Sequence, residues 1–228
     1  MKTFITLLLS AAICLPSFAQ KRTVDAGSFN ELSLGIPANV YLKQGNQKVE
    51  IECDDDIFEE IEFELKGDRL VIKKEGIQMW GSSWRKSEVN IYISMQEIEE
   101  LSVSGSGMIE SDGRLEVEDI KLSVSGSGDI DLDLRSDELD MRISGSGSII
   151  LNGEASEAEA KISGSGKVKA EDMTVGVFEA SISGSGSCYI TATEEVSANI
   201  SGSGSVYYKG EPKRVVSNSS GSGKIRKM

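Results

Sequence analysis

The chain has 228 residues, of which 37 are Asp or Glu and 24 are Lys or Arg, so its formal net charge at pH 7 is −13. Such an acidic chain is not drawn as a whole to nucleic acid or to anionic lipid. Histidine is absent, which excludes Cys/His metal sites and leaves any serine nucleophile without its usual general base.

Residues 1–19 are predicted to be a secretory signal peptide. Lys2 precedes a short apolar run, and the small residues Ser17 and Ala19 stand where a signal peptidase cleaves. We therefore expect Gln20 to be the first mature residue, and the protein to be exported to the periplasm, to the outer-membrane surface or to the medium. The apolar run is too short for a membrane span, and no later segment replaces it, so no integral membrane segment is predicted.

A lipoprotein signal is the alternative for this leader, because it contains Cys14. The residue before that cysteine is Ile13, whereas lipoprotein signals carry a small residue there. Cleavage after Ala19 is therefore the favoured interpretation.

Residues 20–97 are predicted to form an N-terminal β cap or the first, irregular coils of a solenoid; a separate small β domain is the alternative. Their alternating apolar and polar residues, divided by turn residues such as Pro37 and Gly67, predict short strands. Six are expected, at residues 30–35, 39–44, 48–53, 61–66, 69–74 and 88–94. The end of a solenoid needs such a cover, because it exposes apolar side chains and unpaired strand edges.

The segment from Ile77 to Lys86 lies between two of these strands and contains the two tryptophans of the chain, Trp80 and Trp84. Aromatic side chains in a connecting loop are typical of a surface that contacts a glycan or a protein. Trp80 and Trp84 are therefore the candidate partner-binding residues. The alternative is that they fold over the end of the solenoid as part of its cap.

The string SGSG occurs seven times within residues 98–228, at spacings of 18 to 21 residues. The first serines of the copies are Ser104, Ser125, Ser144, Ser163, Ser183, Ser201 and Ser220. The residue before this serine is Val or Ile in six of the seven copies, and the residue five positions after it is Ile, Val or Cys in all seven. A flexible Gly/Ser linker would not keep such registers.

This period, with apolar residues at offsets of two, predicts an all-β fold: a right-handed parallel β-helix with coils of about 19 residues. Identical positions then lie one above another, about 4.8 Å apart. We expect the apolar columns to face inward together with both glycines, and both serines to form an outer wall of hydroxyl groups. The last strand carries charged side chains that would discourage association at its exposed edge, namely Lys224, Arg226 and Lys227.

Two cysteines remain after the predicted cleavage. Cys188 occupies a column otherwise filled by Ile and Val, and Cys53 continues the alternation of Val49 and Ile51. Each is therefore predicted to be a small buried apolar side chain. A disulfide between them, which an exported protein could form, is the alternative.

Three segments together resemble a known family: VYLKQG at 40–45, LVIKKEG at 70–76, and VNIYISMQEIEELSVSGSG at 89–107. In this order, followed by SGSG coils, they resemble the "putative auto-transporter adhesin, head GIN domain" family of exported Bacteroidetes proteins, over residues 29–212. The resemblance implies a β-helical fold, a place in the cell envelope or at the surface, and an adhesive role without a catalytic motif. Nothing in the chain resembles a translocator or sorting domain.

Parallel β-helices also carry polysaccharide lyases and hydrolases, which need unlike catalytic residues gathered at one spot. Asp129, Asp131 and Asp133 share one face of a strand, but no acid repeats at their positions in adjacent coils, so we expect a solvated surface. Calcium-binding coils would need an Asp after every glycine pair, and this pattern is absent. The sequence predicts no metal and no cofactor.

The function predicted from these observations is that of a non-catalytic protein of the cell envelope or surface, an adhesin-like module that binds an unidentified glycan or protein. The alternative is a carbohydrate-active enzyme, a polysaccharide lyase or hydrolase on a β-helix. No nucleic-acid partner is expected, and the oligomeric state is left open.

Overall fold

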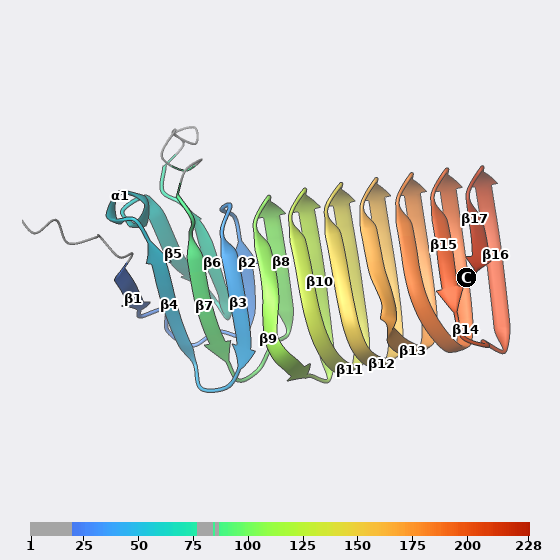
Figure 1. Ribbon diagram of the computed structural model, residues 1–228, viewed down its shortest axis with the longest axis horizontal. Helices are drawn as coiled ribbons and strands as arrows, with labels where there is room; N and C mark the ends of the chain where they lie inside the picture. The colour runs from blue at the N-terminus through green and yellow to red at the C-terminus, as the bar shows by residue number, and fades with distance from the viewer. Residues whose placement is uncertain (1–19, 77–83, 85–86) are drawn as a thin grey trace, which may run out of the picture.

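The structure is a computed structural model that describes residues 20–76, 84 and 87–228 (Figure 1). The described chain is almost entirely β and forms a solenoid of about seven turns with a spacing of about 19 residues. The predicted all-β parallel solenoid is therefore confirmed. Residues 1–19, which carry the predicted signal peptide, lie outside the described part, so the signal peptide stays a prediction.

The central coils are each built from one long strand that bends around a corner. These strands are β11 (Asp129–Gly145), β12 (Ser148–Gly164), β13 (Lys167–Gly184) and β14 (Ser187–Gly202). The first half of β11 pairs in parallel with β9 (Met108–Glu116), and its second half pairs in parallel with β10 (Asp119–Gly126). Each coil therefore contributes one segment to a front wall and one to a rear wall, and an SGSG turn leads to the next coil (Figure 1).

The two walls end in shorter strands at the C-terminus. On the front wall, β15 (Ser205–Lys209) pairs with β14 and with β17 (Lys224–Lys227). On the rear wall, β16 (Arg214–Gly221) pairs with β14. The inward positions of β16 include Ser217 and Ser219, which are exposed, so polar side chains replace the apolar column where the solenoid ends.

The first coils do not follow the order of the chain. β2 (Glu31–Leu34) pairs with both β6 (Arg69–Lys74) and β8 (Glu100–Gly105), and β3 (Asn39–Gln44) pairs with both β7 (Asn90–Met95) and β9. The coil made by β2 and β3 is therefore inserted between the coil of β6 and β7 and the coil of β8 and β9. All six strands predicted in this region are present, but their interleaved order was not predicted.

Antiparallel strands cover the N-terminal end. β4 (Lys48–Cys53) pairs with β7, β1 (Gln20–Val24) pairs with β4, and β5 (Ile61–Lys66) pairs with β6. A single helical turn, α1 (Asp55–Phe58), follows β4 and buries Ile57 against the core. The direction of pairing thus changes from parallel to antiparallel at the end of the solenoid.

The core is one continuous cluster of side chains that lies between the two walls. The predicted columns are buried, including the one formed by Val124, Ile143, Ile162, Ile182 and Ile200. Phe178 is fully buried and lies in register between the smaller Ala158 and Val196. In this column a large side chain thus packs between two smaller ones.

The two glycines of the SGSG turn have different structural roles. The prediction that both face inward was wrong for the first glycine. The first glycine lies at the bend with positive φ, as at Gly145 (φ 126°), a conformation that disfavours a side chain. The second is buried, and a Cβ on Gly147 would lie 2.5 Å from Cγ1 of Val124. The amide of Ser146, between them, donates to the Gly126 carbonyl of the preceding coil at 2.8 Å.

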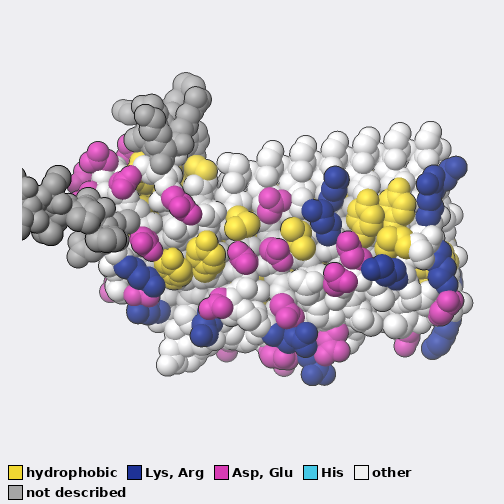
Figure 2. All heavy atoms as spheres, in the orientation of Figure 1, with side chains coloured by type: hydrophobic (Ala, Val, Ile, Leu, Met, Phe, Trp, Pro, Cys, Tyr) yellow, Lys and Arg dark blue, Asp and Glu magenta, His cyan; other side chains and the backbone are white. Residues whose placement is uncertain are grey.

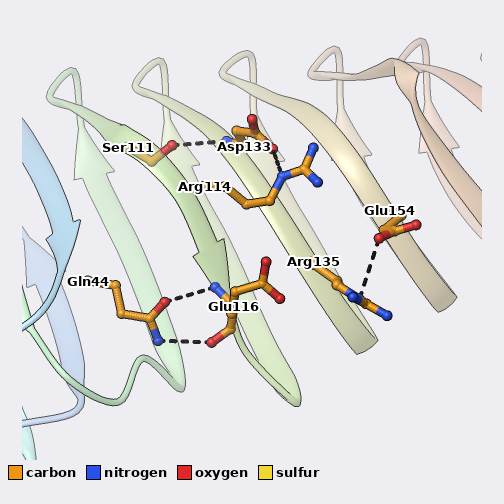
Figure 3. Close-up of polar contacts among 7 residues, drawn as sticks. All are labelled: Gln44, Ser111, Arg114, Glu116, Asp133, Arg135 and Glu154. Atoms are coloured by element: carbon orange, nitrogen blue, oxygen red, sulfur yellow. Dashed lines mark hydrogen bonds and ion pairs between the residues drawn. The ribbon is translucent and has the colours of Figure 1, made fainter.

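Side chains reinforce the corner opposite the SGSG turns (Figure 3). Gln44 continues the ladder beyond β3: its Oε1 accepts from the Glu116 amide at 2.9 Å and its Nε2 donates to the Glu116 carbonyl at 2.9 Å. Ser111 Oγ accepts from the Asp133 amide at 2.9 Å, and Arg114 Nε donates to Asp133 Oδ1 at 2.9 Å. The two bonds to Asp133 span the irregular pairing of β9 with β11.

Candidate functional site

Of the two predicted partner-binding tryptophans, the structure describes Trp84. Trp84 is only 6% exposed, belongs to the apolar core, and donates from Nε1 to Glu60 Oε2 at 2.7 Å. This burial favours the alternative that Trp84 is part of the cap. Trp80 lies outside the described residues. Partner binding through this pair stays a prediction, and the candidate site below rests on other residues.

Cys53 and Cys188 are both free and buried, so the favoured prediction of two unpaired apolar cysteines agrees with the structure. Burial raises the pKa of the Cys188 thiol to about 12 and that of Cys53 to about 11. Thiols held in the protonated form are poor nucleophiles. Neither cysteine therefore contributes a reactive group to the surface.

Two of the three aspartates considered for catalysis, Asp129 and Asp133, have structural partners. Asp129 Oδ1 accepts from the Ser148 amide at 3.0 Å, and Asp133 accepts from Arg114 and donates its amide to Ser111. Within residues 20–76, 84 and 87–228, no cluster of three or more acids or cysteines is placed to hold a metal ion. Asp129 and Asp133 thus bind neighbouring coils to one another.

An open groove with a volume of about 1020 Å³ lies on the rear wall. It runs along the solenoid axis from β10 to β16, beside the SGSG turns. One side is the ladder of first serines, namely Ser144, Ser163, Ser183, Ser201 and Ser220. The other side is the row two residues earlier, namely Ser123, Arg142, Lys161, Ser181, Asn199 and Asn218. We call this hollow the serine groove.

The repeat itself produces the serine groove. Because the pairing is parallel and in register, each serine lies next to the equivalent serine of the neighbouring coil, as Ser163 does next to Ser144 and Ser183. Short side chains at these positions leave the space between the rows open. The predicted outer wall of serines is thus present, and Figure 2 shows the adjoining turn edge as a regular row without charged or hydrophobic side chains.

Polar groups along the groove can bind hydroxyl-bearing molecules. Asn218 Nδ2 donates to Asn199 Oδ1 at 3.1 Å, which leaves amide groups of both residues for further bonds. Lys161 is held by Glu159 at 2.7 Å. Serine hydroxyls both donate and accept, so the groove can form hydrogen bonds with a polyhydroxylated chain at each coil. No group in its lining can act as a paired acid and base.

Comparison with solved structures shows the same fold in other bacterial proteins. The chain is similar to a putative adhesin from Bacteroides fragilis, with 25% identity, a TM-score of 0.84, and coverage of 92% of this chain and 96% of that one. It is also similar in fold to a putative adhesin from Parabacteroides distasonis, with 20% identity, a TM-score of 0.73, and coverage of 92% and 96%. A putative lipid binding protein from the same species has 24% identity, a TM-score of 0.68, and coverage of 93% and 98%.

A search of curated protein sequences gives no match. The part of the chain that the structure describes holds no helix with the length and hydrophobicity needed to cross a membrane. Residues 28–212 match the family described as "Putative auto-transporter adhesin, head GIN domain", close to the predicted range. Because this match covers most of the sequence, the chain belongs to this head GIN domain family.

Proposed function

We propose that this protein is an exported, non-catalytic binding module of the cell envelope, and that it holds an extended neutral glycan in the serine groove. The observation that carries the proposal is the groove itself: an open hollow of about 1020 Å³ that runs across the coils between two rows of polar side chains, with Ile143, Ile162, Ile182 and Ile200 also in its lining. The adhesin-like relatives support a surface binding role.

The geometry suits a polymer better than a compact ligand. Equivalent serines repeat at each coil, about 4.8 Å apart along the axis, so the same hydrogen-bonding groups recur along a line. A glycan chain presents hydroxyl groups along a line in the same manner. A small substrate would instead need several different residues that converge at one point. The groove has the same few residue types repeated along a line.

The proposal is tested with two matched serine variants of the mature protein. Ser183 lines the groove, whereas Ser185, two residues later in the same turn, is exposed outside it. Ser183→Tyr places a bulky ring in the groove, and Ser185→Tyr places the same ring beside it. Binding of cellohexaose, xylohexaose and mannohexaose is measured by isothermal titration calorimetry.

We expect at least one of these neutral hexasaccharides to bind, with affinity reduced at least tenfold by Ser183→Tyr and unchanged by Ser185→Tyr. Absence of binding to all three, or equal loss in both variants, would overturn the proposal. Release of shorter sugars during the titration would place the protein among the carbohydrate-active enzymes instead.

A further inference from the structure

The front wall of the last coils carries two stacked tyrosines between two pairs of cations. One row across the strands is Lys169, Tyr189, Tyr207 and Arg226, and the adjacent row is Lys167, Ser187, Ser205 and Lys224. In both rows a basic residue of β13 is followed by uncharged residues of β14 and β15 and then by a basic residue of β17. Figure 2 shows hydrophobic side chains over these coils with basic side chains on either side. We call these eight residues the tyrosine patch.

The tyrosines form a rigid centre. The ring centroids of Tyr189 and Tyr207 are 4.9 Å apart, and the ring planes differ by 11°. Each ring therefore covers one face of the other, and both side chains are half-buried. The two phenol hydroxyls of this pair can form hydrogen bonds with a partner.

The four cations of the tyrosine patch are exposed, and none forms a hydrogen bond or ion pair with another described residue. Some other basic residues of the solenoid are paired, as Lys161 is with Glu159 and Lys227 is with Glu211 at 2.6 Å. The acids that follow Lys169 on the same strand, Glu171 and Asp172, form no ion pair with the patch. The net charge of −13 gives no indication of such a surface with four unpaired cations.

Protection of the exposed edge explains only part of this arrangement. Lys224 and Arg226 lie on β17, the last strand of the front wall, where a charge discourages association. Lys167 and Lys169 lie on β13, three strands inside that edge. The two pairs are therefore about 14 Å apart, and they enclose the hydroxyl groups of Ser187, Ser205 and the tyrosines.

We propose that the tyrosine patch binds an acidic oligosaccharide. Carboxylates on separate sugar units would pair with the cations of β13 at one end and of β17 at the other. The hydroxyls of the intervening sugar would bond to Ser187, Ser205 and the phenol groups. Charge-assisted hydrogen bonds at both ends give the affinity, and the distance between the pairs selects ligands whose carboxylates lie on separated units.

Two other anionic partners fit the front wall less well. A flat anionic membrane would also lie against Glu110, Asp129 and Asp131, which belong to the same wall, and these carboxylates would repel it. A nucleic acid longer than the patch would extend toward the same carboxylates, and the net charge of −13 disfavours binding of a polyanion. A short acidic sugar occupies only the basic part of the wall.

The experiment measures binding of tri- and hexagalacturonate to the mature protein by isothermal titration calorimetry, with maltohexaose as the uncharged ligand. The test variants are Lys169→Gln with Arg226→Gln, and Tyr207→Ala. Lys227→Gln is the control, because it removes a charge from β17 outside the two rows of the patch. Circular dichroism verifies the fold of every variant.

We expect galacturonate to bind at this patch and maltohexaose not to bind there. The affinity for galacturonate should fall at least tenfold in the double variant and measurably in Tyr207→Ala. It should not change in Lys227→Gln. Absence of galacturonate binding overturns the proposal, as does an equal loss in Lys227→Gln. Binding to phosphatidylserine vesicles without binding to galacturonate would assign the patch to a lipid surface. Ser183→Tyr should leave galacturonate binding unchanged, which separates this proposal from that of the serine groove.

Discussion

Gly166 lies directly against Ile143 of the preceding coil, so closely that a Cβ on Gly166 would be 2.4 Å from Ile143 Cγ2. The same relationship recurs between Gly186 and Ile162 and between Gly204 and Ile182. The second glycine of each turn thus lets the turn close over the apolar column. The serine groove depends on this closeness, because the first serines lie immediately before the turn.

Gly166→Ala is predicted to lower the free energy of unfolding by about 1–3 kcal/mol, since overpacking a filled interior costs about this much. The methyl group would also approach the Gly147 carbonyl oxygen, 2.9 Å from the Cβ position. Urea denaturation followed by circular dichroism gives the value. Ser165→Ala, at an exposed position of the same turn, is the control, and equal effects of the two substitutions would contradict this account of the glycine.

Ile162→Asp is predicted to unfold the solenoid at moderate temperature. Ile162 is 2% exposed, and an unpaired buried charge costs several kcal/mol. Asp131→Asn, on the outer face of the front wall, should leave the melting temperature within about 2 °C of the wild-type value, because surface substitutions change stability by less than about 0.5 kcal/mol. Thermal melts of both variants test this, and a similar loss in the two would mean that inner and outer columns were misassigned.

Glu60 should titrate below the normal range of a glutamate. The hydrogen bond from Trp84 Nε1 is the largest cause of its lowered pKa, followed by the bond from Lys74. A lowered folded pKa stabilises the native state above the unfolded pKa, and this contribution is lost as the pH falls through the folded pKa.

Trp84→Phe removes the indole donor while keeping an aromatic ring in the cap. The pKa of Glu60 should therefore rise toward its ordinary value, as measured by the carboxyl ¹³C shift during an NMR pH titration. A pKa that is unchanged in the variant would show that the bond to Trp84 does not hold the carboxylate.

Stability should fall at alkaline pH because of the two cysteines. Their folded pKa values, about 11 for Cys53 and about 12 for Cys188, lie above the unfolded value of about 8.5. The unfolded thiols lose protons first as the pH rises, so the contribution is complete below about pH 8.5 and declines up to about pH 12. Cys188→Ala should flatten this decline in urea melts between pH 8 and 10, and an unchanged slope would contradict it.

The repeat made the solenoid predictable, because Val124, Ile143 and Ile162 recur in fixed register with SGSG and alternate as a strand does. The insertion of β2 and β3 between later strands was not predictable in this way. Those strands carry no repeat, and alternation shows which face is buried but does not show which neighbour a strand pairs with. The different roles of the two glycines could be assigned only from the structure, because the sequence SGSG is compatible with either role at each glycine.

The surfaces were predictable to different degrees. The serine ladder follows directly from the repeat. The tyrosine patch was visible only in part: Lys169, Tyr189 and Tyr207 align when the coils are stacked, but the net charge of −13 directs attention away from any basic surface. Trp84 was predicted to bind a partner because it is an aromatic residue in a connecting segment. Its burial could not be predicted from the local sequence.

The most direct test of the proposed function is to map the ligand on the protein. The ¹⁵N-labelled mature chain is titrated with whichever neutral hexasaccharide binds in calorimetry, and backbone amide shifts are followed. We predict that the shifted amides lie along the rear wall, at Ser163, Ser183, Asn199, Ser201 and Asn218, with the front wall unchanged. Shifts confined to the front wall or to the N-terminal cap would contradict the assignment of the serine groove as the binding site.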